Sequence, residues 1–177
     1  MNLEEKKISG ELIYKGIFLE LQKDIVELPN GKQCVREFIH HPGAVVIIPI
    51  LDNGDVVMER QFRYPSGQVF LELPAGKIDA GEDHRTCGER ELLEETGYLA
   101  KNFEYIGKLH PGIGYTDEII YIYKATGLKN VGSKLDEDEF LEVFTAPLNE
   151  IYEMMLAGKI TDAKTMISLF WVKHHLI

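Results

Sequence analysis

An α+β fold in a single domain is what this amino-acid sequence predicts, and three observations support it. The chain has 177 residues, which fits one domain better than two. Hydrophobic residues make up 45% of it, which is enough for a packed core. Apolar segments of strand length outnumber helical patterns, and the two kinds do not alternate regularly. This order favours an α+β sandwich over a doubly wound parallel sheet.

The strands are predicted from short apolar runs that end at turn residues. Pro29-Asn30-Gly31 and Asp52-Asn53-Gly54-Asp55 supply two of these turns. The longest apolar run, 44–51, is interrupted by Pro49 and suits a buried strand. The predicted strands span residues 8–13, 17–28, 33–39, 43–51, 56–64, 69–73, 105–109, 119–125 and 140–145.

Three helices are predicted, over residues 82–96, 147–157 and 163–175. Gly97 follows the first of them, where a left-handed C-terminal cap is expected. The second begins at Pro147 and stops at Gly158, in agreement with the usual preference for proline at helix starts and glycine at helix ends.

Charge and cysteine content narrow the class of protein. The net charge of −10 argues against general nucleic-acid binding, which needs a basic surface. No apolar stretch approaches the roughly 20 residues of a membrane helix, and the charged N-terminus does not resemble a signal peptide. Cys34 and Cys87 form no CxxC pair and no zinc spacing, so we expect two reduced thiols in a cytoplasmic protein.

The helix over residues 82–96 places three carboxylates on one face. At about 100° per residue, Glu94 lies near −60° and Glu95 near +40° from Glu91, an arc of roughly 100°. Like charges at this spacing cost roughly 0.2–0.5 kcal/mol per pair. A hard divalent cation such as magnesium, manganese or calcium would reverse that cost. The alternative is a solvated acidic face neutralised by Arg85 or Arg90.

Residues 76–98 carry the most specific pattern. Gly76 is followed after five residues by Glu82, and Glu82 after seven by Arg90-Glu91-Leu92-Leu93-Glu94-Glu95-Thr96-Gly97. This spacing resembles the signature of the Nudix hydrolases at every fixed position, and only the final bulky aliphatic position departs from it, with Tyr98. Further segments resemble the ADP-ribose pyrophosphatase branch of that family: His41-Pro42-Gly43-Ala44-Val45, Arg60-Gln61-Phe62-Arg63, Leu73-Pro74-Ala75-Gly76, Asp136-Glu137-Asp138-Glu139 and Asp162-Ala163-Lys164-Thr165.

The resemblance implies a Nudix-type α/β/α sandwich with a mixed sheet, in residues 41–177. It implies an N-terminal antiparallel β extension, residues 1–40, that dimerises as part of the same unit. The expected partners are therefore a second copy of the chain and a nucleoside diphosphate sugar, with no nucleic acid and no membrane.

The resemblance also implies roles for individual residues. Glu91, Glu94, Glu95 and the carbonyl of Ala75 would hold Mg²⁺, with Mn²⁺ as a substitute. Glu137 would be the base that acts on the attacking water, with Glu139 as the alternative or an accessory ligand. The remaining implied roles are a phosphate contact for Arg63, with a surface ion pair as the alternative, a contribution of Arg36 to the nucleobase pocket of the partner subunit, and a place for Glu118 after a substrate-side loop. The resemblance also implies an ion pair between Arg90 and Glu82 and tight backbone at Gly76 and Gly97. Phe18 is expected either to stack on a base or to be a buried core ring.

The implied reaction is hydrolysis of a pyrophosphate bond to a nucleoside monophosphate and a sugar phosphate. The substrate is ADP-ribose, an ADP- or GDP-hexose, or both kinds. Typical ADP-ribose hydrolases carry a proline sixteen residues beyond the last glycine of the signature, and this chain has Ile113 there and Pro111 nearby. Two alternatives are a catalytically silent nucleotide-binding module on the same fold and a structural calcium site on an acidic helix.

Overall fold

The computed structural model describes residues 2–133, 135 and 140–175. Its elements, in chain order, are β1 (Lys6–Lys15), β2 (Glu20–Glu27), β3 (Gln33–His40), β4 (Ala44–Pro49), β5 (Asp55–Arg63), a short 3-10 turn (Tyr64–Ser66), β6 (Gln68–Glu72), β7 (Ala75–Lys77), α1 (His84–Thr96), β8 (Tyr98–Leu109), β9 (Ile120–Asn130), β10 (Leu141–Pro147), α2 (Leu148–Leu156) and α3 (Ala163–His175).

The chain divides into two compact units. The first contains residues 1–42 and 110–119, and the second contains residues 43–109 and 120–177. In the first unit, β1, β2 and β3 form an antiparallel sheet. Residues 115–117 extend its β3 edge, because the Ile39 N–H donates to the Tyr115 carbonyl (2.8 Å) and the Asp117 N–H donates to the Ile39 carbonyl (3.3 Å).

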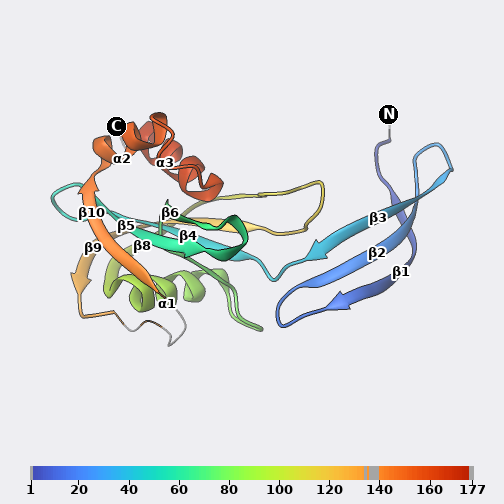
Figure 1. The fold of residues 1–177 in the computed structure, drawn as a ribbon, viewed down its shortest axis with the longest axis horizontal. Helices are drawn as coiled ribbons and strands as arrows, with labels where there is room; N and C mark the ends of the chain where they lie inside the picture. The colour runs from blue at the N-terminus through green and yellow to red at the C-terminus, as the bar shows by residue number, and fades with distance from the viewer. Residues whose placement is uncertain (1, 134, 136–139, 176–177) are drawn as a thin grey trace. The chain divides into compact units, whose positions relative to one another are not determined.

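The second unit is a sandwich of helices around two sheets, with strand orders β10-β5-β6 and β7-β4-β9-β8. The pair β4 and β9 is parallel and the other pairs are antiparallel, so the larger sheet is mixed. Figure 1 shows α1 on one side of these sheets and α2 and α3 on the other. The predicted α+β class and α/β/α arrangement are confirmed.

Strand β4 explains why the helices lie on both sides. Its residues are buried on both faces, as is usual for a strand covered by helices. Val46 and Ile48 pack in one core with residues of α2 and α3, such as Ile151 and Leu169. The alternate residues of β4 pack in a second core with Cys87 and Leu92 of α1.

Three strand boundaries differ from those predicted by three residues or more, and the others by at most two. Strand β2 begins at Glu20 instead of residue 17, because Gly16 to Leu19 form a turn in which the Gly16 N–H donates to the Leu19 carbonyl. Strand β8 begins at Tyr98, and β9 continues to Asn130, where the two strands pair. The short strand β7 was not predicted. Among the helices of the described residues, none is long and apolar enough to cross a membrane.

Candidate active site

The helix that carries the acidic face, α1, is fixed at both ends. Asp83 caps its start by accepting the Arg85 and Thr86 N–H groups. Gly97 caps its end with φ 74°, and its N–H donates to the Leu93 carbonyl. A Cβ at Gly97 would lie only 2.5 Å from the Ser133 nitrogen, so both conformation and space require glycine.

Arg90 is the centre of the acidic face. Its Nε and Nη2 donate to the two oxygens of Glu82, each at 3.0 Å, which is the ion pair that the resemblance implies. Its Nη1 donates to Glu91 Oε1 and Glu94 Oε2, each at 2.9 Å. These bonds raise the pKa of Arg90, chiefly through Glu82, and in turn hold the pKa of Glu82 below its usual value. The neutralisation by Arg90 that the sequence left as an alternative is therefore present.

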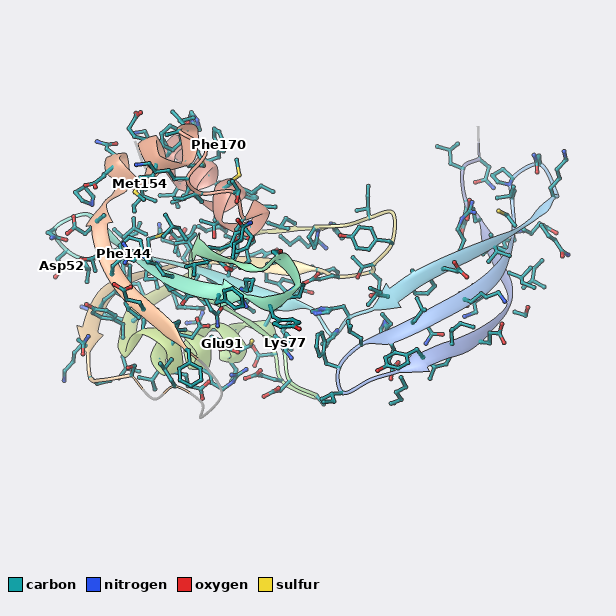
Figure 2. All side chains as sticks on the ribbon, in the orientation of Figure 1. Asp52, Lys77, Glu91, Phe144, Met154 and Phe170 are labelled. Atoms are coloured by element: carbon teal, nitrogen blue, oxygen red, sulfur yellow. The ribbon has the colours of Figure 1, made fainter. Side chains whose placement is uncertain are left out.

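The Glu91 carboxyl group lies directly against the backbone of Gly76. A Cβ at Gly76 would lie 1.9 Å from Glu91 Cδ, so only glycine leaves room for this side chain. Figure 2 labels Glu91 on α1 and Lys77, the residue next to Gly76 in β7.

The Cys87 thiol donates to the Lys77 carbonyl at 3.3 Å, and burial raises the pKa of Cys87 to about 12. The thiol is therefore protonated near pH 7 and is a poor nucleophile.

Glu95 is buried beside the Glu91 and Glu94 pair, with 2% of its surface exposed. Its Oε2 accepts the Ala75 N–H at 3.0 Å. Ala75 in turn pairs with Val46 of β4. The carboxylate of Glu95 therefore ties the last turn of α1 to the start of β7.

The chemistry of this face fits a hard cation. Within the described residues, no group of three or more His, Cys, Asp and Glu side chains is already gathered as a metal-ligand cluster. However, Glu91 and Glu94 both face one guanidinium nitrogen, so two carboxylates already converge on a common positive charge. Carboxylate and carbonyl oxygens are the donors that Mg²⁺ and Mn²⁺ prefer. A cation held by Glu91 and Glu94 would share them with Arg90 or displace it.

A second charged cluster lies where β5 and β6 meet the start of α3, and the sequence did not predict it. Arg63 Nε and Nη2 donate to the two oxygens of Glu72, each at 2.8 Å. Lys164 donates to Glu72 and, at 3.0 Å, to Asp162. Burial alone would raise the pKa of Glu72, but the hydrogen bonds from Arg63 and the charge of Lys164 outweigh it and lower that pKa. Glu72 is the one charged residue in the apolar run 69–73, and this is the feature of the sequence that indicates a buried partner.

The other expected substrate contacts lie in the first unit. Phe18 packs edge-on against His41, with ring centroids 6.4 Å apart, and His41 Nδ1 lies 3.7 Å from Glu118 Oε1. The structure thus brings Phe18 and Glu118 to one histidine. Arg36 lies elsewhere in this unit, where its Nε and Nη2 donate to Glu5 at 2.9 and 2.6 Å. The two expected bases, Glu137 and Glu139, lie outside the described residues.

The chain is similar to one protein family and to proteins with known names and structures. A family model described as NUDIX domain matches residues 40–170. An ADP-ribose pyrophosphatase from Bacillus subtilis (strain 168) is 39% identical over 174 residues, covering 97% of this chain and 94% of the relative. A methanol dehydrogenase activator from Bacillus methanolicus is 41% identical over 172 residues, covering 96% and 93%. The crystal structure of an ADP compounds hydrolase, 24% identical, superposes with a TM-score of 0.87 over 99% of this chain and 96% of that one.

Proposed function

This chain belongs to the Nudix family, and from that premise we propose that it hydrolyses the pyrophosphate bond of nucleoside diphosphate sugars. ADP-ribose and ADP- or GDP-linked hexoses are the candidate substrates, and the products are a nucleoside monophosphate and a sugar phosphate. The relative from Bacillus subtilis is named ADP-ribose pyrophosphatase. The relative from Bacillus methanolicus carries a different name at similar identity. The proposal therefore depends on the side chains of α1, where Glu91 and Glu94 converge on one positive charge.

Mg²⁺ is the proposed cofactor, with Mn²⁺ as a substitute. Glu91, Glu94, Glu95 and the carbonyl of Ala75 would hold it. When bound, it supplies positive charge that neutralises the phosphates and lowers the pKa of water.

The chain's own residues supply the rest. Glu82 and Arg90 brace the loop before α1. Arg63 contributes a partly exposed guanidinium for the phosphates. Glu137, or else Glu139, accepts the proton of the attacking water. Arg36, Phe18 and Glu118 are the proposed contacts to the nucleotide.

A panel of nucleoside diphosphate sugars, assayed for phosphate-monoester products with and without Mg²⁺, tests this function. We expect turnover of at least one member that disappears on chelation of the metal. Binding without turnover would instead indicate a catalytically silent nucleotide-binding module. Unaltered turnover in chelator would contradict the metal assignment.

We also propose that residues 1–40 form a dimerising extension and that the protein is a homodimer. In the first unit, the described hydrophobic side chains are all at least partly exposed except that of Val26, which is buried. Ile8, Leu12, Tyr14 and Val35 of its three-stranded sheet are exposed. A small sheet needs a covered apolar face to be stable, and a second copy would cover it. Light scattering at micromolar concentration should give twice the mass of the 20.2 kDa chain. A monomer mass under these conditions would contradict the proposal.

We also propose that the protein is located in the cytoplasm. Cys34 and Cys87 are both free thiols, as expected in a reducing compartment. Cell fractionation would test this location, and recovery of the protein outside the cytoplasmic fraction would contradict it.

A further inference from the structure

The cluster around Glu72 combines buried negative charge with one partly exposed cation. Glu72 in β6 is paired across the strands with Glu59 in β5, and both carboxylates are fully or almost fully buried. Like charges opposite each other in a sheet are destabilising unless cations compensate them. The charges of Glu59 and of Glu95 from α1 also act on Arg63 and help to raise its pKa, after the larger effect of the Glu72 hydrogen bonds.

Arg63 has the most exposed side chain of this cluster. Its side chain is 40% exposed, whereas that of Glu72 is 2% exposed. The fork of Nε and Nη2 onto Glu72 uses two of the five N–H donors of a guanidinium. The fork also fixes the plane of the group, and a guanidinium in a fixed plane suits bidentate binding of phosphate.

Lys164 holds the other side of the same carboxylate. It lies at the start of α3, its side chain is 13% exposed, and it contacts the Glu72 oxygen that also accepts Arg63 Nη2. Asp162 accepts from Lys164 and from the Thr165 N–H, which fixes the lysine to the helix start. The Thr165 hydroxyl then accepts the N–H of Leu73, the residue after Glu72.

We propose that Lys164 is a positioning residue for Arg63, and that it acts through Glu72 to keep the guanidinium in place for the diphosphate of the substrate. This inference rests on the proposed function. Lys164 fixes the Glu72 carboxylate from the α3 side, and Glu72 fixes the plane of Arg63. Without Lys164, one guanidinium faces the carboxylates of Glu59, Glu72 and Glu95, and an anionic ligand meets less positive charge at a less ordered group.

The affinity for ADP, measured by calorimetry in magnesium buffer, tests the inference without turnover. We expect Lys164→Met to weaken ADP binding about tenfold and Lys164→Arg to restore most of it. Lys173→Met is the matched control, because Lys173 lies on the same helix but contacts Asn149 and Tyr152. It makes the same change in charge and should leave the affinity unaltered.

A double-mutant cycle with Glu72→Gln identifies the route. In the Glu72→Gln background, Lys164→Met should change ADP affinity less than about twofold, because the link to Arg63 is already cut. The double variant of Glu72→Gln and Lys164→Met removes both charges of the ion pair, so neither charge is left buried without its partner. Thermal unfolding of each variant shows whether it is folded. A full tenfold effect in this background would overturn the proposed route.

A drop in melting temperature for Lys164→Met with unaltered ADP affinity would show a structural role only, and would likewise overturn the inference. ADP binding and turnover, measured together, distinguish failure of this inference from failure of the proposed function. ADP binding that depends on Lys164, without turnover of any nucleoside diphosphate sugar, would refute the function and support the inference. Absence of ADP binding by the wild-type protein would overturn the inference.

Discussion

Replacement of Glu95 by Gln should lower kcat by at least about a hundredfold, because outer-shell partners of metal ligands already cost about 10–100-fold when removed and Glu95 is a proposed ligand itself. The fold should persist. Glu95 is buried, and its Oε2 accepts the Ala75 N–H at 3.0 Å. A glutamine carbonyl can accept the same hydrogen bond. The substitution therefore removes negative charge while it keeps the tie between α1 and β7.

The measurement is kcat at saturating Mg²⁺, together with thermal unfolding with and without the metal. Glu89→Gln is the matched control, because Glu89 lies on the same helix, is half exposed and pairs with Arg85 at i,i+4. We expect the control to retain full activity and the stabilisation by Mg²⁺, and Glu95→Gln to lose both. Wild-type turnover in the Glu95 variant at saturating Mg²⁺ would remove Glu95 from the metal site.

The geometry of α1 could be predicted from the sequence because its information is local. Glu91, Glu94 and Glu95 share a face through helical periodicity alone, and Gly97 marks the end of the helix by its own conformational preference. The reason for Gly76 could not be read in the same way. Its need for glycine comes from the Glu91 side chain that lies against it, fifteen positions later in the chain.

The cluster around Glu72 shows where sequence reasoning ends. Glu72 and Lys164 are 92 positions apart, and no periodic pattern links residues at that separation. Residues 162–165 resemble a motif of the family, but their contacts with Glu72 and Leu73 depend on how the chain folds. A charged residue in an apolar strand indicates that a partner must exist, but it does not identify the partner.

The missed parts of the sheets have a similar cause. The segment from Tyr98 to Glu104 contains Lys101 and Asn102, and its alternation is weak. It becomes a strand because β9 continues beside it to Asn130, with Gly127 at φ 64° within the pair. Pairing between distant segments stabilises these residues more than their own propensity does.

The second large effect is expected at Glu137, the proposed base. Replacement by Gln should lower kcat by about 10²–10⁴-fold, the usual contribution of a general base, with little change in Mg²⁺ binding. Glu139→Gln is the alternative variant, and the one with the larger loss identifies the base. Glu142→Gln is the control, because Glu142 follows Glu139 by three positions in the sequence, is exposed in β10 and pairs with Arg60 at 2.9 Å.

Reaction in oxygen-18 water shows which bond is cut. Attack on either phosphorus of the pyrophosphate gives the same two products, and the label enters the one whose phosphorus was attacked. Attack at the sugar carbon would instead release a nucleoside diphosphate and a free sugar, which requires a carboxylate pair around the anomeric centre. A nucleoside diphosphate product, or label in neither monophosphate, would overturn the proposed reaction. Undiminished rates in both the Glu137 and Glu139 variants would leave the metal site in place, and the segment between β9 and β10 would no longer be the source of the base.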